Sequence, residues 1–253
     1  MTETPDIRQP ERAVTGEAKG CSLHSLVLQP VYDVGGITIY CGDNRKILPL
    51  LDDYDLLLTD PPYGIGVVNN RHGSVTSIKS GSKAYGRSDW DNATPPEWVL
   101  QLAVAKAKWQ IIWGGNYFGL PPSRGWLVWD KGQRDFSLAD AELAWTNLDA
   151  AVRVMTYARG QLNAEGKVHP TQKPEPLMSW CLNQVPTAKT ICDPWMGSGT
   201  TLVAAKARGL RAIGIEANET YCRAAVARLA QDVLGLENAR ICDGGPAARP
   251  IGD

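Results

Sequence analysis

The stretch ICDPWMGSGTTLVAAKARGLRAIGIEAN, residues 191–218, decides the fold. Its start predicts a short strand, its two glycines a tight turn, its apolar middle a helix that ends at Gly209, and RAIGIEAN a second strand. A helix that crosses between two strands of one sheet makes those strands parallel. This segment therefore predicts a strand-helix-strand unit at the heart of the protein.

The rest of the chain repeats this alternation. Further strands are expected at residues 37–43, 54–60, 110–116, 125–131 and 150–158. Helices are expected at residues 94–108, 173–185 and 219–235. The first helix has a start signal, with Thr94 as N-cap, Pro95 at the first helical position and Glu97 three residues after the cap. The alternation predicts an α/β protein with a doubly wound, mostly parallel sheet.

Composition limits the other possibilities. The 253 residues are 43% hydrophobic and 21% charged, with a net charge of −1, which is typical of globular proteins. We expect flexible tails at residues 1–22 and 243–253 and a single domain at residues 23–242. Neither a run of 18 apolar residues nor a signal peptide occurs, so we expect a cytoplasmic protein without a membrane span. The six cysteines and three histidines are scattered, which indicates free thiols and no metal site.

A group suited to a planar amine follows the apolar strand YDLLLTD. Asp60, Pro61, Pro62 and Tyr63 come directly at its end. Prolines have no N–H, so the turn presents carbonyl oxygens beside a carboxylate and an aromatic ring. Such a site can accept both protons of a ring NH₂ group and stack on the ring, as adenine or cytosine would require. Held in this way, the amine can turn its lone pair toward an electrophile.

The glycine turn of the opening stretch predicts a nucleoside-type cofactor. Gly197 and Gly199 allow a close approach of the backbone, and the helix that starts near Thr200 favours a negative group. Glu216 ends the following strand, where an acid can accept hydrogen bonds from ribose hydroxyls. A dinucleotide such as NAD is the alternative, but the third glycine of its usual motif is missing. A methyl donor with a nucleoside and an amino-acid carboxylate fits the amine-holding turn better.

Over residues 37–230 the sequence resembles the DNA amino-methyltransferases that use S-adenosylmethionine. TDPPYG (59–64) resembles their catalytic motif and DPWMGSGTT (193–201) their cofactor loop, while HPTQKP (169–174) resembles the segment before that loop in the β class. The catalytic motif precedes the cofactor loop, which implies the circularly permuted form of the Rossmann-like methyltransferase fold. The two halves of the chain must then complete one sheet.

The resemblance also implies roles for individual residues. The flipped base would be held by Asp60, Pro61, Pro62 and Tyr63. The cofactor would be bound by Asp43, Asp60, His169, Thr171, Lys173, Asp193, Gly197, Ser198, Gly199, Thr200, Glu216 and Asn218. Lys173 would lie near the methionine end of the cofactor, where a cation suits a carboxylate.

Contacts with double-stranded DNA are expected outside these motifs. The loop at residues 64–88 contains basic residues and no acidic one, although the whole protein is nearly neutral. The DNA contacts are predicted at Arg71, Lys79, Lys83, Arg87, Arg153 and Arg159. In the β class a target-recognition region precedes HPTQKP, and here only the short insert at about 147–168 is available for it. The resemblance also allows a homodimer and a place in a restriction-modification system.

The sequence thus predicts an enzyme that flips a base out of duplex DNA and methylates its exocyclic amine. Adenine N6 is preferred, because Asp in the first position of the catalytic motif is the commoner form among adenine enzymes of this resemblance. Cytosine N4 is the alternative. A protein-glutamine methyltransferase and an inactive DNA-binding module are further alternatives.

Overall fold

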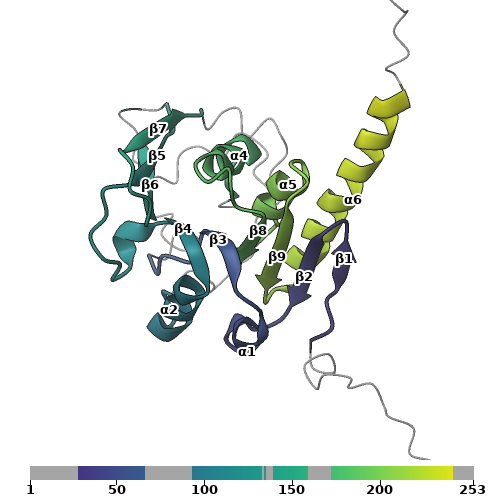
Figure 1. Ribbon diagram of the computed structural model, residues 1–253, viewed down its shortest axis with the longest axis horizontal. Coiled ribbons are helices and arrows are strands. Elements are labelled where there is room, and N and C mark those ends of the chain that lie inside the picture. Colours follow the sequence, from purple (N-terminus) through teal and green to yellow (C-terminus); the bar gives the residue numbers. More distant parts are fainter. Residues whose placement is uncertain (1–27, 66–92, 133, 135–138, 159–171, 242–253) are drawn as a thin grey trace, which may run out of the picture.

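The computed structural model describes residues 28–65, 93–132, 134, 139–158 and 172–241, with side chains up to residue 231 (Figure 1). The strands are β1 (Tyr32–Val34), β2 (Ile37–Cys41), β3 (Tyr54–Thr59), β4 (Ala107–Trp113), β5 (Trp126–Asp130), β6 (Ala141–Thr146), β7 (Arg153–Thr156), β8 (Thr190–Asp193) and β9 (Arg211–Glu216). The helices are α1 (Asn44–Ile47), η2 (Leu48–Leu50), α2 (Glu97–Ala105), η3 (Gly115–Tyr117), α4 (Glu175–Asn183), α5 (Thr200–Lys206) and α6 (Glu219–Ile241). The two predicted tails lie outside the described residues.

All nine strands form one sheet in the order β1-β2-β9-β8-β3-β4-β6-β5-β7. Five consecutive strands of this order run parallel to one another, namely β2, β9, β8, β3 and β4. In Figure 1, α1 and α2 lie on one side of this sheet and α4 and α5 on the other. The predicted α/β class and doubly wound, mostly parallel sheet are therefore confirmed.

The two halves of the chain meet at two places in the sheet. β2 pairs with β9 over five residues, from Ile37 opposite Ala212 to Cys41 opposite Glu216. β3 pairs with β8 through Leu56 opposite Ile191. These pairings complete one sheet from N-terminal and C-terminal strands, as the permuted order of the motifs predicts.

The core has two parts because the central strands are buried on both faces. Leu56 and Leu58 of β3 belong to the cluster with α4 and α5, while Leu57 belongs to the cluster with α2. Successive strand side chains point to opposite faces, so a continuous apolar run is required where helices cover both. The run in β3 satisfies this requirement.

The predicted start of the first long helix is wrong. α2 begins at Glu97, and its N-cap is Pro96, which has an extended backbone with ψ 133° and makes no side-chain cap. A residue before a proline is driven away from the helical region, so Thr94 and Pro95 cannot begin the helix when Pro96 follows. The helix also ends at Ala105, before the predicted Lys108, because β4 begins at Ala107 and pairs with β3.

Two strands were not predicted. β1 pairs antiparallel with β2 at one edge, and β6 lies antiparallel between β4 and β5. β6 has only six residues, AELAWT, in which polar and apolar positions do not alternate clearly. Among the helices that the structure describes, none combines the length and the apolar character that a membrane span needs.

Gly115 is expected to be essential for packing the end of β4 on β6. A Cβ at this position would lie 2.3 Å from Cβ and 2.9 Å from the backbone nitrogen of Trp145. Gly115→Ala should therefore lower the free energy of unfolding by about 1–3 kcal/mol, the usual cost of overpacking. Urea denaturation measures it. Gly119→Ala is the control, because a Cβ there meets nothing within 4 Å, and equal effects of the two substitutions would contradict this account.

Candidate active site

The catalytic turn lies at the carboxyl end of β3, next to the carboxyl end of β8. Because the two strands are parallel neighbours, Asp60 and the glycine turn after Asp193 emerge at the same edge of the sheet. Thr59 Oγ1 donates a hydrogen bond of 2.7 Å to Asp193 Oδ1 and ties the two strand ends together. Ligand sites of open α/β sheets form at this edge.

Both oxygens of the Asp60 carboxylate have partners. Lys173 Nζ donates to Oδ2 at 2.5 Å, and the Tyr63 hydroxyl donates to Oδ1 at 2.5 Å. Lys173 Nζ also lies 3.2 Å from the Tyr63 hydroxyl oxygen. Burial raises the pKa of Asp60, although Lys173 opposes the shift. The family resemblance implies that Lys173 binds the cofactor, whereas here its ammonium contacts the catalytic carboxylate.

A second ion pair, absent from the sequence analysis, lies behind the first. Glu142 of β6 places Oε2 3.0 Å from Lys173 Nζ and Oε1 2.7 Å from Lys131 Nζ. Burial alone would raise the pKa of Glu142, but Lys173 and Lys131 lower it to about 2. Burial disfavours the ammonium form of Lys173, yet Asp60 and Glu142 outweigh this and raise its pKa well above the usual range. The four side chains form a neutral charge cluster (Lys131, Glu142, Lys173 and Asp60).

Aromatic side chains surround the ring of Tyr63. Tyr117 stacks on it with ring centroids 5.0 Å apart and 17° between the planes, and Phe118 meets it edge-on at 6.4 Å. Gly114, at φ +68°, packs so close that a Cβ would lie 2.1 Å from Tyr63 Cε1. The sequence signal for this contact is the Gly-Gly pair directly after β4, within residues 110–116, where only a strand was expected.

The glycine turn has the backbone that its sequence predicts. Gly197 and Gly199 have φ of +53° and +77°, a region that residues with a Cβ rarely adopt. Gly197 N donates to Glu216 Oε2 at 3.1 Å, and Asn218 N donates to Glu216 Oε1 at 2.7 Å. Burial raises the pKa of the Glu216 carboxyl. Glu216 therefore links the turn to the end of β9.

Further polar contacts hold the turn from both sides. Arg228 of α6 donates to the Ser198 carbonyl at 2.7 Å and to Thr200 Oγ1 at 3.1 Å. Ser198 Oγ donates to Gln172 Oε1 at 3.2 Å. Asn44 Nδ2 donates to the Pro194 carbonyl at 3.1 Å. Arg228 and Asn44 lie outside the sequence motifs, and Gln172 lies within HPTQKP but was given no role there.

Two predicted cofactor residues are engaged within the protein. Asp193 is 3% exposed, and its Oδ1 accepts hydrogen bonds from Thr59 and from Trp195 N. Burial raises the pKa of Asp193 to about 6. Asp43 caps α1 through Arg45 N and forms an ion pair of 2.7 Å with the Arg45 guanidinium, which lowers its pKa.

Only part of the predicted DNA and cofactor set can be located. Arg71, Lys79, Lys83, Arg87, Arg159, His169 and Thr171 lie outside the described residues. Arg153 is exposed at the start of β7, which is four strand positions from β3. β7 runs parallel to β5 and hence to β3, so Arg153 lies toward the amino edge of the sheet, opposite Asp60. The structure does not bring it to the catalytic turn.

The described cysteines form no disulfide, and the described side chains form no cluster of metal ligands. Cys41, Cys181, Cys192 and Cys222 are free thiols, which confirms the prediction for the four cysteines in the described ranges. Among the side chains that the structure describes, no group of three or more His, Cys, Asp or Glu could hold a metal ion.

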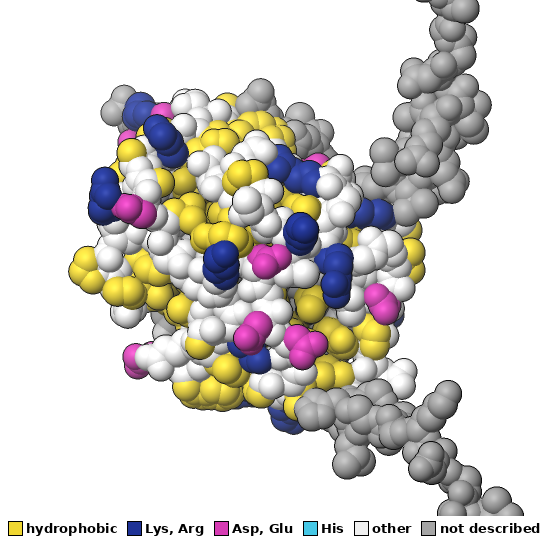
Figure 2. Space-filling view, viewed as in Figure 1, with side chains coloured by type: hydrophobic (Ala, Val, Ile, Leu, Met, Phe, Trp, Pro, Cys, Tyr) yellow, Lys and Arg dark blue, Asp and Glu magenta, His cyan; other side chains and the backbone are white. Residues whose placement is uncertain are grey.

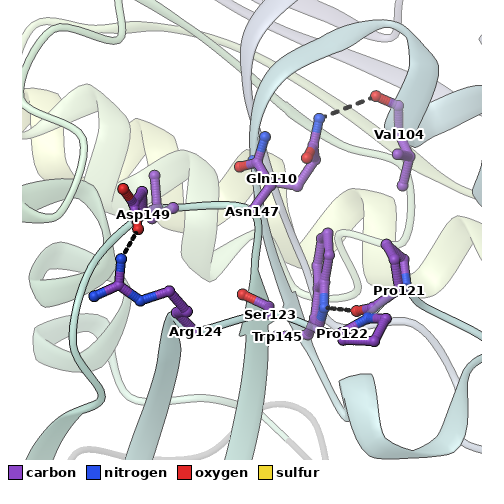
Figure 3. A pocket seen from close by; sticks show the side chains of 10 residues that line it. Val104, Gln110, Pro121, Pro122, Ser123, Arg124, Trp145, Asn147 and Asp149 are labelled. Atoms are coloured by element: carbon purple, nitrogen blue, oxygen red, sulfur yellow. Dashed lines mark hydrogen bonds and ion pairs between the residues drawn. The ribbon is translucent and has the colours of Figure 1, made fainter.

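A hollow of about 410 Å³ lies away from this site, at the amino edge of β4 and β5 (Figure 3). Its polar side chains are engaged with one another or with the backbone. Gln110 donates to the Val104 carbonyl, Trp145 donates to the Pro121 carbonyl, and Arg124 pairs with Asp149. These internal contacts explain its lining without a ligand.

Comparisons with known proteins find similarity to DNA methyltransferases. The family model of the N6 and N4 methyltransferases, described as DNA methylase, matches residues 109–227. The type II methyltransferase M2.DpnII of Streptococcus pneumoniae is 26% identical over 258 residues, which cover 81% of this chain and 93% of that protein. M.ScaI of Streptomyces caespitosus is 22% identical and covers 82% of this chain and 86% of its own length. The crystal structure of the M1.HpyAVI–SAM complex has the same fold, with a TM-score of 0.51, 21% identity and coverage of 76% of this chain and 99% of its own.

Asp193 should make stability depend on pH. Its pKa is raised to about 6 in the folded protein, so the folded state binds its proton more tightly than the unfolded state does. The stability due to this proton is present below about pH 4 and is lost as pH rises to about 6. Asp193→Asn should therefore be progressively more stable than the parent above pH 4, by up to about 3 kcal/mol at neutral pH.

Urea unfolding at pH 4.5 and 7.5 measures this difference. Asp52→Asn, at an exposed position, is the matched control and should show no comparable trend. An Asp193→Asn effect of the same size at both pH values would contradict the predicted linkage.

Proposed function

We propose that this chain, a member of the S-adenosylmethionine-dependent DNA amino-methyltransferases, methylates N6 of an adenine flipped out of duplex DNA. The relatives and the family model support transfer to an exocyclic amine of DNA, either adenine N6 or cytosine N4. The preference for adenine comes from Asp60 in the first position of the catalytic motif.

One observation carries the proposal: the catalytic turn and the glycine turn leave adjacent parallel strands at the same edge of the sheet. The hydrogen bond of 2.7 Å from Thr59 to Asp193 joins these two strand ends. A base held at Asp60 and a cofactor held over Gly197 would therefore be neighbours. Proximity of this kind supplies much of the rate enhancement in a group transfer.

The residues present fit S-adenosylmethionine. A Cβ at Gly197 would meet nothing within 4 Å, so the turn is open on that side. Glu216 ends β9 and Asp43 follows the end of the neighbouring strand β2, where carboxylates suit ribose hydroxyls and an adenine amine. When bound, the cofactor supplies a methyl group on a positively charged sulfur. Gly197, Gly199, Glu216 and Asp43 would hold it, with Ser198, Thr200 and Asn218 beside them.

The catalytic turn would prepare the amine. Asp60 Oδ1 and the Pro61 carbonyl accept its two N–H groups, because each oxygen has lone pairs for more than one hydrogen bond. Two fixed acceptors turn the nitrogen lone pair out of conjugation with the ring. As the amine nitrogen takes the methyl group, the bond from that carbon to the sulfonium sulfur would break and the sulfur would leave as a neutral thioether. One N–H proton must then leave the methylated nitrogen. Asp60, whose pKa is raised by burial, is the base in contact.

Tyr63 would stack on the flipped base, and Tyr117 would give way. Tyr117 stacks on Tyr63 at 5.0 Å and is 45% exposed, so it can leave toward solvent without unpacking the core. A nucleobase offers Tyr63 a larger flat surface than a phenol does, which favours the exchange.

DNA binding must rely on local groups. On the face in Figure 2, the described Lys and Arg side chains are scattered among acidic and apolar ones, in line with a net charge of −1. The loop at residues 64–88 supplies basic side chains next to the catalytic turn in the sequence, which supports its proposed contact with phosphate. Four features stay predictions: a homodimer, a cytoplasmic location, a single domain at residues 23–242 and a role for the insert at 147–168.

The proposed reaction is tested with labelled S-adenosylmethionine and duplex DNA of mixed sequence, followed by mass spectrometry of the nucleosides. N6-methyladenine is expected, and N4-methylcytosine would support the runner-up instead. Transfer to a protein glutamine, or no transfer at all, would contradict the proposed function.

Asp60→Ala should lower methyl transfer by at least about 100-fold, because an amine acceptor is lost at the reacting nitrogen. Asp60→Asn should lose less, since its amide oxygen can still accept one hydrogen bond. Cofactor affinity, measured by calorimetry, should be largely unchanged in both. Asp52→Ala is the control for an acidic residue removed elsewhere, and full activity of Asp60→Ala would refute the assigned role.

Reversing Lys79 and Lys83 to Glu should weaken DNA binding and make the dependence of log K on log salt less steep. The reason is that fewer counterions are released when fewer cations reach the phosphates. Fluorescence anisotropy with a labelled duplex at several salt concentrations measures both quantities. Unchanged affinity and slope would remove this loop from the DNA interface.

A further inference from the structure

Lys173 lies between two carboxylates that come from different parts of the sheet. Its Nζ is 2.5 Å from Asp60 Oδ2 and 3.0 Å from Glu142 Oε2. The side chain is 4% exposed, so water offers little alternative solvation to the ammonium. The residue belongs to the segment before α4, whereas Asp60 follows β3 and Glu142 lies on β6. Three elements therefore converge on one buried charge.

Glu142 is held more firmly than Lys173. It lies in the second position of β6, opposite Trp129 of β5, within a sheet that has strands on both sides of β6. Lys131, also 4% exposed, pairs with its other oxygen at 2.7 Å. Lys131 N in turn donates to the Asp140 carbonyl at 2.9 Å, just before β6. The carboxylate of Glu142 is thus fixed by the strand and by a second cation.

The contact between Glu142 and Lys173 acts through charge. Although Oε2 is 3.0 Å from Nζ, it accepts no hydrogen bond from any residue that the structure describes. The hydrogen bonds of Nζ go to Asp60 Oδ2 and Tyr63 Oη. Glu142 can therefore stabilise the ammonium without withdrawing its N–H groups from the catalytic turn. A lysine side chain has four rotatable bonds, and a second carboxylate restricts where its charge can lie.

We propose that Glu142, supported by Lys131, is a positioning residue for methyl transfer: it holds the Lys173 ammonium on Asp60 Oδ2, so that Oδ1 faces the amine. The proposal rests on the proposed function of Asp60. Glu142 itself touches neither base nor cofactor in this role. It acts through Lys173, which fixes the orientation of the carboxylate that the amine must meet.

The alternative role of Lys173, on the carboxylate of the cofactor, predicts different kinetics. If Lys173 orients Asp60, loosening it lowers kcat and leaves cofactor affinity unchanged. If Lys173 binds the cofactor, loosening it weakens cofactor binding and leaves kcat nearly unchanged at saturation. The two roles can therefore be separated by measuring kcat and the cofactor Kd together.

Glu142→Gln, Lys173→Met and the double variant form the experiment, with Glu97→Gln on the exposed surface of α2 as the matched control. Glu142→Gln keeps the shape and removes the charge. We expect kcat to fall about 10- to 100-fold, with the cofactor Kd changed by less than about 3-fold. In the Lys173→Met background, Glu142→Gln should cause no further loss of activity, because Glu142 acts on Asp60 only through Lys173. Additive losses, or a loss confined to cofactor affinity, would overturn the proposal.

A second readout does not need activity. Among the described residues, the titratable groups that face Lys173 are Asp60, Tyr63, Glu142 and Cys181 of α4. Removal of the Glu142 charge should increase the neutral fraction of Lys173, so its acetylation by acetic anhydride at pH 8 should rise about 10-fold or more by peptide mass spectrometry. The Glu97→Gln control should leave the acetylation of Lys173 unchanged. If Glu142→Gln also leaves it unchanged, Glu142 does not hold Lys173 and the proposal is overturned. If Glu142→Gln does not fold, Glu142→Asp, which keeps the charge but shortens the reach, is measured in the same way. If Glu142→Gln raises the acetylation of Lys173 but the parent protein methylates no DNA, the proposed function is refuted, while the role of Glu142 in holding Lys173 stands.

Discussion

The parallel pairing of β3 with β8 determines where the chemistry can occur. Leu56 and Leu57 lie opposite Ile191 and Cys192. Just beyond these pairs, at the strand ends, the Thr59 hydroxyl donates to the buried carboxylate of Asp193. The strands come from segments more than a hundred residues apart, yet their carboxyl ends lie together because parallel strands end at the same edge. Without this register, the acceptors of the catalytic turn and the glycine turn would not share one edge. The site needs both turns at the same edge of the sheet and does not depend on their order along the chain. The permuted order of the motifs is therefore tolerated.

The antiparallel part of the sheet supplies the charges. β6 enters between β4 and β5 and places Glu142 against Lys131 and Lys173, so that two buried cations and two partly buried carboxylates lie in one cluster. A buried charge is costly unless it is paired, and removing one member of such a group leaves another unpaired. The neutral composition of the cluster lets Lys173 stay an ammonium although only 4% of its side chain is exposed.

The sequence predicted most of the parallel sheet and the catalytic turn, since both depend on local signals. The apolar run of β3 requires burial on both faces, and the prolines after Asp60 restrict their own backbone. It did not predict β6, whose short mixed pattern depends on pairing with β4 and β5, between 11 and 35 residues away, nor the ion pair of Glu142 with Lys173. It also misplaced the start of α2, because the steric effect of Pro96 on the residue before it outweighs the capping pattern at Thr94. Lys173 was found by motif, but its contact with Asp60 required the fold.

The contacts of Tyr63 suggest how the site can choose an amine-bearing ring. Its hydroxyl donates to Asp60 Oδ1, and its ring stacks on Tyr117. These contacts satisfy the partly buried carboxylate of Asp60 and cover the ring of Tyr63, so the catalytic turn is not strongly destabilised before a base binds. A flipped adenine or cytosine brings a further N–H donor for the Asp60 carboxylate and a flat face that can take the place of Tyr117 on the Tyr63 ring. A ring without an amino group could cover Tyr63 but would leave Asp60 with no new donor. Selectivity for the amine then follows from the additional donor that Asp60 Oδ1 gains.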